Sequence, residues 1–119
     1  MDWKFTDDRP IWQQITDQLT LAILKGEYPP GGRLPPVREL AAQAGVNPNT
    51  MQRALAQLEQ EGLARADRTA GRLVTQDAAA LEGARLREAR AVVQGYFEAM
   101  SALGYSRERA VELLKEENP

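Results

Sequence analysis

The segment at residues 45–48 leaves a single residue, Val46, between a helix stop and a helix start. Gly45 can adopt the left-handed conformation that ends a helix. Asn47 is a favourable N-cap, and Pro48 suits the first helical position because its missing N–H is not needed there. A helix, a tight glycine turn and an N-capped helix in this order are typical of a helix-turn-helix, which the sequence therefore predicts.

Apolar residues recur at spacings of three and four on both sides of this junction, and again near the N-terminus. The pattern predicts helices over about 10–25, 36–44 and 48–61, each followed by a glycine that ends it. Val46 and Met51 are placed to form a hydrophobic staple at the start of the third helix. The expected buried stripes are Ile11, Ile15, Leu19, Ala22 and Ile23 in the first helix, Val37, Leu40, Ala41 and Ala44 in the second, and Met51, Ala54, Leu55 and Leu58 in the third.

Two short runs follow the third helix, Leu63–Ala66 and Arg72–Thr75, separated by a polar turn that contains a glycine. Short runs on either side of such a turn predict a β-hairpin. A hairpin directly after a helix-turn-helix is a wing. Arg33-Leu34, which follows a turn rich in proline and glycine, is a candidate for a very short additional strand.

The composition removes most enzyme chemistry. The 119 residues contain no Cys, which excludes disulfides and thiolate metal sites, and no His, the usual general base near neutral pH. The 17 acidic residues form no pair with metal-like spacing, so we expect no enzyme activity, no metal and no cofactor. Because the sequence has neither a run of about 18 apolar residues nor a signal-peptide pattern, we expect a cytoplasmic protein without a membrane anchor.

The outward side of the third helix carries short polar side chains near its N-terminal half. In a helix-turn-helix this half enters the major groove of DNA. The Asn49 and Gln52 side chains offer paired donors and acceptors that match the edge of adenine, and Arg53 matches guanine or a phosphate. The same face, completed by Ala56, is equally compatible with an ordinary solvated helix surface.

Binding to DNA also requires cations that contact phosphates, because these contacts supply most of the affinity. The formal net charge is −2 at pH 7, so any basic surface must be local. The wing tip carries Arg68, Thr69, Gly71 and Arg72, although an ordinary hairpin turn would explain the glycine equally well. The candidate phosphate anchors are Arg33, Arg38, Arg53, Arg65, Arg68 and Arg72.

From about Ala78 the sequence predicts a long helix that ends at Gly104 and a shorter one capped by Ser106. Residues 76–119 are too few to form a good core alone, so the apolar seam of the long helix must pack on another surface. That surface is either the rest of the chain or a second subunit, and dimerisation is favoured because paired DNA readers gain affinity and half-site spacing. The seam has heptad spacing and consists of Leu86, Ala89, Val93, Tyr96, Met100 and Leu103.

Two stretches carry several motifs in order: PIWQQI at 10–15 and LKGEYPPGGRLPPVRELAAQAGVNPNTMQRALAQLEQEGL at 24–63. With these motifs, residues 10–75 resemble the winged helix of the GntR family of bacterial transcription regulators. The VNPNT sequence at 46–50 and the tail of two helices are similar to the small YtrA-type subfamily. The resemblance implies that this tail is a helical dimerisation unit rather than a ligand-binding domain.

The resemblance implies DNA contacts at Arg38, at the start of the recognition helix and at the wing glycine, Gly71. Three positions depart from the family pattern: Pro36 replaces a capping serine, Pro48 replaces an arginine of other subfamilies, and Thr69 replaces the first wing glycine. Arg53 is the candidate replacement for the lost arginine contact. The implied recognition-helix positions are Asn47, Pro48, Asn49, Thr50, Gln52 and Arg53.

These observations predict a mainly α protein with a small β-hairpin wing, with a winged helix-turn-helix over 1–75 and a two-helix dimerisation segment over 76–119. The resemblance implies a homodimeric repressor that binds a palindromic operator in double-stranded DNA, with a transporter operon as a candidate target. The alternative is a winged-helix protein-interaction module without specific DNA binding, which the net acidity mildly favours. The predicted DNA-binding residues are Arg38, Asn47, Asn49, Thr50, Gln52, Arg53, Arg68, Thr69, Gly71 and Arg72.

Overall fold

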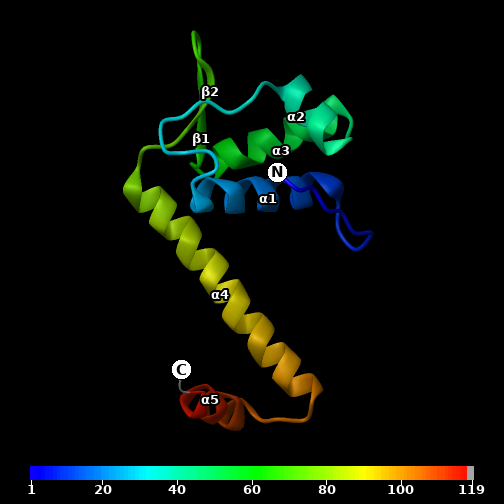
Figure 1. The fold of residues 1–119 in the computed structure, drawn as a ribbon, viewed down its shortest axis with the longest axis vertical. Coiled ribbons are helices and arrows are strands. Elements are labelled where there is room, and N and C mark those ends of the chain that lie inside the picture. Colours follow the sequence, from blue (N-terminus) through cyan, green and yellow to red (C-terminus); the bar gives the residue numbers. More distant parts are fainter. Residues whose placement is uncertain (118–119) are drawn as a thin grey trace. The chain divides into compact units, whose positions relative to one another are not determined.

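The computed structural model describes residues 1–117 and contains the predicted elements in the predicted order (Figure 1). The mainly helical fold with one small hairpin is confirmed, and the element bounds agree with the sequence patterns to within a few residues. The elements are α1 (Ile11–Lys25), α2 (Val37–Ala44), α3 (Pro48–Gln60), β1 (Ala64–Asp67), β2 (Gly71–Val74), α4 (Ala78–Ala102) and α5 (Arg107–Glu116).

The chain separates into two compact units, the first covering Met1–Ala84 and the second beginning at Arg85. The first unit contains α1, α2, α3, the hairpin and the start of α4. The second contains the remainder of α4 and α5. The assignment of DNA binding to 1–75 and of dimerisation to 76–119 stays a prediction, because it concerns activities rather than compactness.

The predicted helix-turn-helix rests on the caps at residues 45–48. Gly45 has a φ of 70° and ends α2 in the left-handed conformation, while the Val46 N–H donates to the Ala41 carbonyl at 3.0 Å. The Asn47 side chain accepts a hydrogen bond from the Asn49 backbone N–H at 2.7 Å, as an N-cap does. Pro48 then occupies the first helical position of α3.

The prolines that precede α1 and α2 lie just outside their helices. Pro10 and Pro36 have extended ψ angles of 139° and 155°, so the helices begin at Ile11 and Val37 rather than at the prolines. Neither proline supplies a side-chain cap. The first N–H groups of both helices therefore have no capping side chain, which matters for the exposed start of α2.

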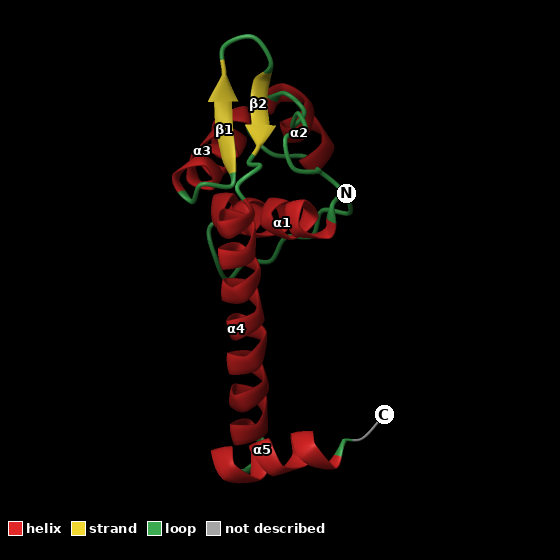
Figure 2. Cartoon of the chain, turned by 90° about the vertical axis from the view of Figure 1, so that its left-hand side faces the viewer, coloured by secondary structure: helices red, strands yellow, loops and turns green. Residues whose placement is uncertain are grey.

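The wing is an antiparallel pair in which Ala64 faces Val74 and Asp67 faces Gly71 (Figure 2). Arg33 joins β2 through a single bridge to Leu73, so the short strand predicted at Arg33-Leu34 is present only as one bridge. The Leu34 N–H donates to the Arg72 carbonyl at 2.9 Å. This third segment ties the loop before α2 to the wing.

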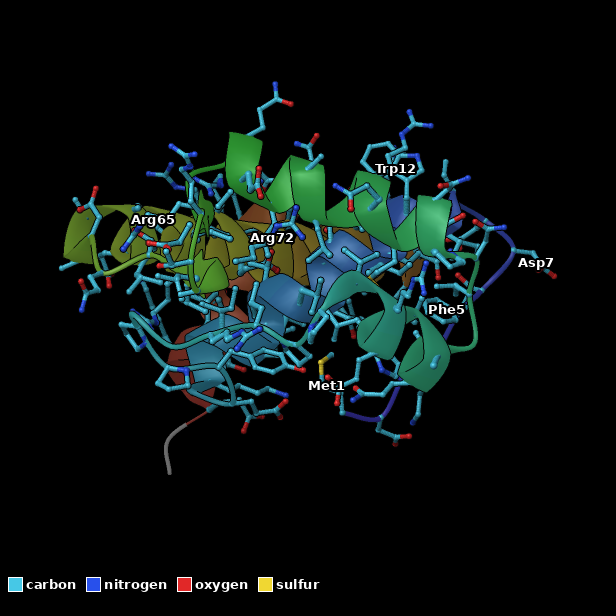
Figure 3. The ribbon with its side chains drawn as sticks, turned by 90° about the horizontal axis from the view of Figure 1, so that it is seen from above. Met1, Phe5, Asp7, Trp12, Arg65 and Arg72 are labelled. Carbon is cyan, nitrogen blue, oxygen red and sulfur yellow. The ribbon has the colours of Figure 1, made fainter. Side chains whose placement is uncertain are left out.

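The N-terminal segment, in which Figure 3 labels Met1, Phe5 and Asp7, is joined to α1 by the side chains of two glutamines, an arrangement that the sequence patterns did not predict. The Gln14 side chain accepts from the Thr6 backbone N–H at 2.8 Å and donates to the Thr6 carbonyl at 2.9 Å. Gln18, one turn later, accepts from the Lys4 N–H and donates to its carbonyl in the same way. Each carboxamide thus pairs with the backbone as a neighbouring strand would.

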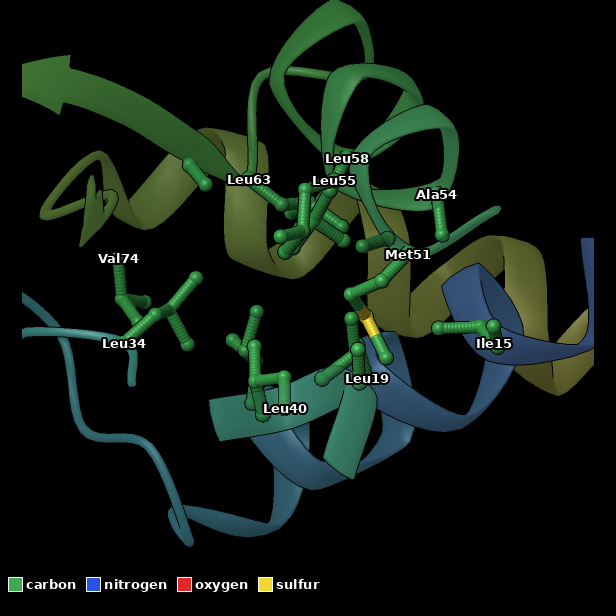
Figure 4. Close-up of a cluster of buried hydrophobic side chains, with 14 residues drawn as sticks. Ile15, Leu19, Leu34, Leu40, Met51, Ala54, Leu55, Leu58, Leu63 and Val74 are labelled. Carbon is green, nitrogen blue, oxygen red and sulfur yellow. The ribbon is translucent and has the colours of Figure 1, made fainter. Parts of the chain in front are cut away.

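The core of the first unit forms where α1, α2 and α3 meet (Figure 4). The predicted stripe of α3 is fully confirmed, since all four of its apolar residues are buried. In α1 and α2, Ile11, Val37 and Ala44 are only half-buried, and the other stripe residues are buried. The largest side chains that are fully enclosed are Ile15, Leu19, Leu34, Leu40, Met51, Leu55, Leu58, Leu63 and Val74.

The second unit is held by contacts between α4 and α5. The Tyr96 hydroxyl donates to the Ala110 carbonyl at 2.6 Å, and the guanidinium of Arg107 lies 4.0 Å from the centre of the Phe97 ring. Gly104 has a φ of 93°, and the Ser106 side chain caps α5, both as predicted. Among residues 1–117, no helix is both long enough and apolar enough to cross a bilayer.

Candidate nucleic-acid interface

The outer surface of α3 presents a polar stripe opposite its buried leucines. Asn49, Gln52, Arg53 and Ala56 are all exposed, as the sequence predicts. The buried residues of the same helix hold it rigidly against α1 and α2. The stripe is therefore a surface whose side chains project from a fixed backbone.

The residues at the start of α3 have mainly a positioning role in this structure. The Asn47 carboxamide oxygen is occupied by the cap hydrogen bond to Asn49, and Thr50 is half-buried. Asn49 is exposed and lies one helical turn before Gln52 and Arg53.

One flank of α3 lies against α1, where the side chains of Arg53 and Trp12 meet. The guanidinium carbon of Arg53 lies 4.4 Å from the centre of the Trp12 ring, a cation–π distance. Trp12 is labelled beside α3 in Figure 3. In the sequence, Trp12 stands out only as part of a family motif, because no local pattern shows which side chain of α3 will cover it.

The opposite flank of α3 is tied to the wing. The Nε atom of Arg72 donates to the Glu59 carboxylate at 2.5 Å, and only 18% of the Arg72 side chain is exposed. Arg72, predicted to contact DNA, is therefore engaged within the protein and links β2 to α3. Arg65, another candidate phosphate anchor, lies 3.7 Å from Asp67 in an exposed pair of the kind that contributes little to stability.

The wing turn is organised by the carboxylate of Asp67. Its Oδ1 atom accepts hydrogen bonds from the Ala70 N–H, the Thr69 N–H and the Thr69 hydroxyl, each at 2.9 Å. In this turn only Gly71, with a φ of 85°, has a left-handed backbone. Thr69 therefore fits where the family usually has glycine, because its position in this turn requires no positive φ.

These hydrogen bonds favour the charged form of the Asp67 carboxyl group. The backbone N–H groups of Ala70 and Thr69, and then the Thr69 hydroxyl, lower the pKa of Asp67 from 3.8 to about 2. Because the pKa is lower in the folded protein, the turn gains stability from this group above pH 3.8. That contribution is lost as the pH falls through about 2.

The amide protons of Thr69 and Ala70 should therefore report a single titration near pH 2. Their NMR chemical shifts, followed from pH 5 to about 1.5, measure the pKa of Asp67 directly. In the Asp67→Asn variant these resonances should not titrate, because the carboxamide keeps an acceptor oxygen but has no ionisable proton. A midpoint near 3.8 in the wild type would contradict the hydrogen-bonded turn.

A groove of about 340 Å³ runs between α3, the start of α2 and the wing. Gln52 lines it from α3, and Pro36 and Val37 line it from α2. Arg33 enters beside the wing, with its Nε atom 3.5 Å from the position that a Cβ atom of Gly71 would occupy. The groove thus brings together Gln52 of the polar stripe, the uncapped start of α2 and the basic side chain of Arg33.

The cations around this groove are mostly unneutralised. Within residues 1–117, the guanidinium groups of Arg33, Arg38 and Arg68 form neither an ion pair nor a hydrogen bond. Two nearby acids are already engaged, Glu59 by Arg72 and Asp67 by the wing turn. From Arg33 to Arg72 the chain carries six arginines and four acidic residues, so this segment has a small positive excess despite the net charge of −2.

Comparisons with known proteins agree with this arrangement. Residues 11–74 match the bacterial regulatory proteins of the gntR family. The chain is 35% identical to the uncharacterized HTH-type transcriptional regulator YhcF of Bacillus subtilis, over 97% of this chain and 95% of that protein.

A second relative matches a shorter part of the chain. The HTH-type transcriptional repressor YtrA of Bacillus subtilis is 42% identical over 58% of this chain and 53% of its own length. Among solved structures, a GntR family transcriptional regulator from Listeria monocytogenes superposes with a TM-score of 0.81 at 33% identity. That match covers 96% of this chain and all of the other, so the likeness extends over both units.

Proposed function

Because this chain belongs to the GntR family of DNA-binding transcription regulators, which are not enzymes, we propose that it is a homodimeric repressor of a palindromic operator. The family resemblance of residues 10–75 is confirmed by the match over 11–74, and relatives of the YtrA type are among the similar proteins. In this proposal α3 enters the major groove and the wing contacts the adjacent backbone.

The observation that carries the proposal is the exposed stripe of Asn49, Gln52 and Arg53 on a rigidly packed helix. Carboxamides pair with adenine through two hydrogen bonds, and a guanidinium pairs with guanine in the same way. Ala56, next along the stripe, has a methyl side chain that permits close approach and can contact a thymine methyl group.

The phosphate contacts are assigned to the free arginines around the groove. Arg38 projects from the first turn of α2, where uncapped backbone N–H groups also favour an anion. Arg33, whose guanidinium lies beside Gly71, and Arg68 extend this basic surface to the turn of the wing. Arg72 contributes indirectly by holding the wing against α3 through Glu59.

Dimerisation is assigned to the seam of α4. Three large apolar residues of the seam are exposed in the single chain: Leu86 at 46%, Val93 at 52% and Leu103 at 73%. Tyr96 and Met100 are half-buried, and Tyr96 is bonded to α5, so the seam is partly covered within its own unit. A second copy of the chain would cover the exposed part and place two α3 helices about 34 Å apart on one face of DNA.

Repression is the direction favoured by the relatives, because the similar YtrA protein of Bacillus subtilis is named a repressor. A repressor of this kind needs only to occupy its operator, and the structure describes two helices after the wing, α4 and α5.

Selection of bound duplexes from random DNA tests the proposal. We expect an inverted repeat whose half-sites are centred about 10 base pairs, or a multiple of this, apart. If each subunit neutralises three phosphates, the slope of log K against log salt should be about −5. Failure to retain any duplex at about 150 mM salt would favour the alternative, a protein-interaction module.

The division between phosphate anchors and base readers gives a further prediction. Arg38→Gln should weaken binding to all duplexes alike and make the salt slope shallower by about 1, whereas Gln52→Ala should cost about 1–3 kcal/mol only at the preferred base pair. Titrations of the selected duplex and its single-base-pair variants at several salt concentrations measure both effects. Gln43→Ala, an exposed change on α2, is the control, and identical profiles for all three variants would contradict the assigned roles.

A further inference from the structure

Arg53 is the only charged side chain in the exposed stripe of α3, and its guanidinium is already placed before any DNA is present. It lies over the Trp12 ring at 4.4 Å from the ring centre. An exposed arginine normally samples many rotamers, and fixing it costs conformational entropy on binding. A stacked arginine has already lost much of that freedom.

The ring that supports Arg53 is itself held in place. Trp12 is half-buried and packs against the hydrophobic core of the first unit. The Thr16 hydroxyl lies 3.0 Å from the carbonyl oxygens of both Trp12 and Ala54, so it joins α1 to α3 beside both stacking partners. Buried contacts therefore fix the position of the Trp12 ring relative to the backbone of Arg53.

The stack covers the face of the guanidinium and leaves its edge available. A cation–π contact uses the plane of the group, whereas its N–H donors lie in that plane and point outward. Acidic residues near Trp12 do not compete for these donors, because Asp17 pairs with Arg9 at 2.7 Å and Glu61 accepts from Gln57 at 3.0 Å. In the described part of the chain, Arg53 forms no ion pair or side-chain hydrogen bond.

We propose that Trp12 is a specificity-determining positioning residue, which aims the N–H edge of Arg53 at guanine in the major groove. This inference rests on the proposed function. It assigns to α1 a share in base selection that its position outside the helix-turn-helix does not suggest. Gln52, on the opposite flank toward the wing, forms no side-chain hydrogen bond within residues 1–117 and gains no comparable support.

The test measures sequence preference, defined as the ratio of dissociation constants for the selected duplex and a single-base-pair variant. Arg53→Ala identifies the base pair that Arg53 reads, with an expected loss of preference of about tenfold or more. Trp12→Leu should reduce preference at that same base pair by about 2- to 5-fold, since an exposed cation–π contact has this strength. Trp12→Tyr should retain most of the preference.

Controls separate positioning from general structural damage. Gln13 follows Trp12 in the chain and lines, with it, a second groove between α1 and α3; Gln13→Ala should leave the preference unchanged. Adding Trp12→Leu to Arg53→Ala should cause no further loss at that base pair. If Trp12→Leu does not fold, a Trp3→Phe variant leaves Trp12 as the one tryptophan, and fluorinated tryptophans can be incorporated there. Fluorine weakens the attraction of the Trp12 ring for cations and keeps the volume of the ring. The sequence preference should therefore fall as the number of fluorine atoms increases.

Unchanged or increased preference in Trp12→Leu, or in the fluorinated proteins, would overturn the role of Trp12 while leaving Arg53 as a base reader. Absence of any preference in the wild-type protein would instead overturn the proposed function and, with it, this inference. If the wild-type protein showed a preference and Arg53→Ala left it unchanged, Arg53 would not contact a base. Trp12 would then have no base-contacting side chain to position.

Discussion

Replacing Leu86 and Val93 together with glutamate should convert the protein to a monomer and lower its affinity for the palindromic operator by about 100-fold or more. Both side chains are about half exposed in the single chain, at 46% and 52%, and lie one heptad apart in the seam of α4. A dimer would bury them against identical residues. Four buried carboxylates without partners cannot be accommodated in such an interface.

The loss of affinity follows from bivalence. In a dimer, binding of one α3 helix holds the second near its half-site at a high effective concentration, and a monomer lacks this advantage. Sedimentation of the free protein gives the oligomeric state, and titration of full and half operators gives the affinity. The half-site affinity of the monomer should stay close to that of one wild-type subunit.

Ala91→Glu is the matched control, because Ala91 is exposed on the same helix at the position farthest from the seam. It should leave both the dimer and operator affinity unchanged. A double Leu86→Glu, Val93→Glu variant that remained dimeric would show that the subunits associate through another surface.

Replacing Leu55 with alanine should lower the free energy of unfolding of the first unit by about 2–5 kcal/mol. Leu55 is fully buried on α3, where it contributes to the core shared with α1 and α2. Removal of its side chain loses apolar burial and leaves a cavity, because the surrounding structure relaxes only partly. The core holds the polar stripe of α3 in place, so the proposed operator binding should decline as the variant unfolds.

Urea unfolding followed by circular dichroism measures the change. Gln60→Ala, an exposed substitution at the end of the same helix, should alter stability by less than about 0.5 kcal/mol. Equal stability of Leu55→Ala and the wild type would contradict the position of α3 in the core.

The helices, their ends and the hairpin were predictable because their signals are local. Gly45 and Asn47 act through the backbone of their immediate neighbours, and the apolar stripe of α3 acts through a fixed helical period. The errors at Pro10 and Pro36 are one residue in size, since proline suits both the last extended residue and the first helical one.

The exposed site was predictable only in part. Asn49, Gln52 and Arg53 follow from the same period that buries Leu55, because a helix residue that faces away from the core faces solvent. Arg72 could not be assigned in this way. Its guanidinium is paired because Glu59, 13 residues earlier in the chain, lies within hydrogen-bond distance once the wing packs beside α3.

The sequence alone determined, to within a few residues, where each element begins and ends, and it determined which face of each helix is apolar, since these properties depend on interactions within a few residues. Only the tertiary structure decided which distant side chains meet: Gln14 with the Thr6 backbone, Arg53 with Trp12, and Arg72 with Glu59. These pairings depend on how the elements pack. Because packing is set by the whole core rather than by a local pattern, no short stretch of sequence contains that information.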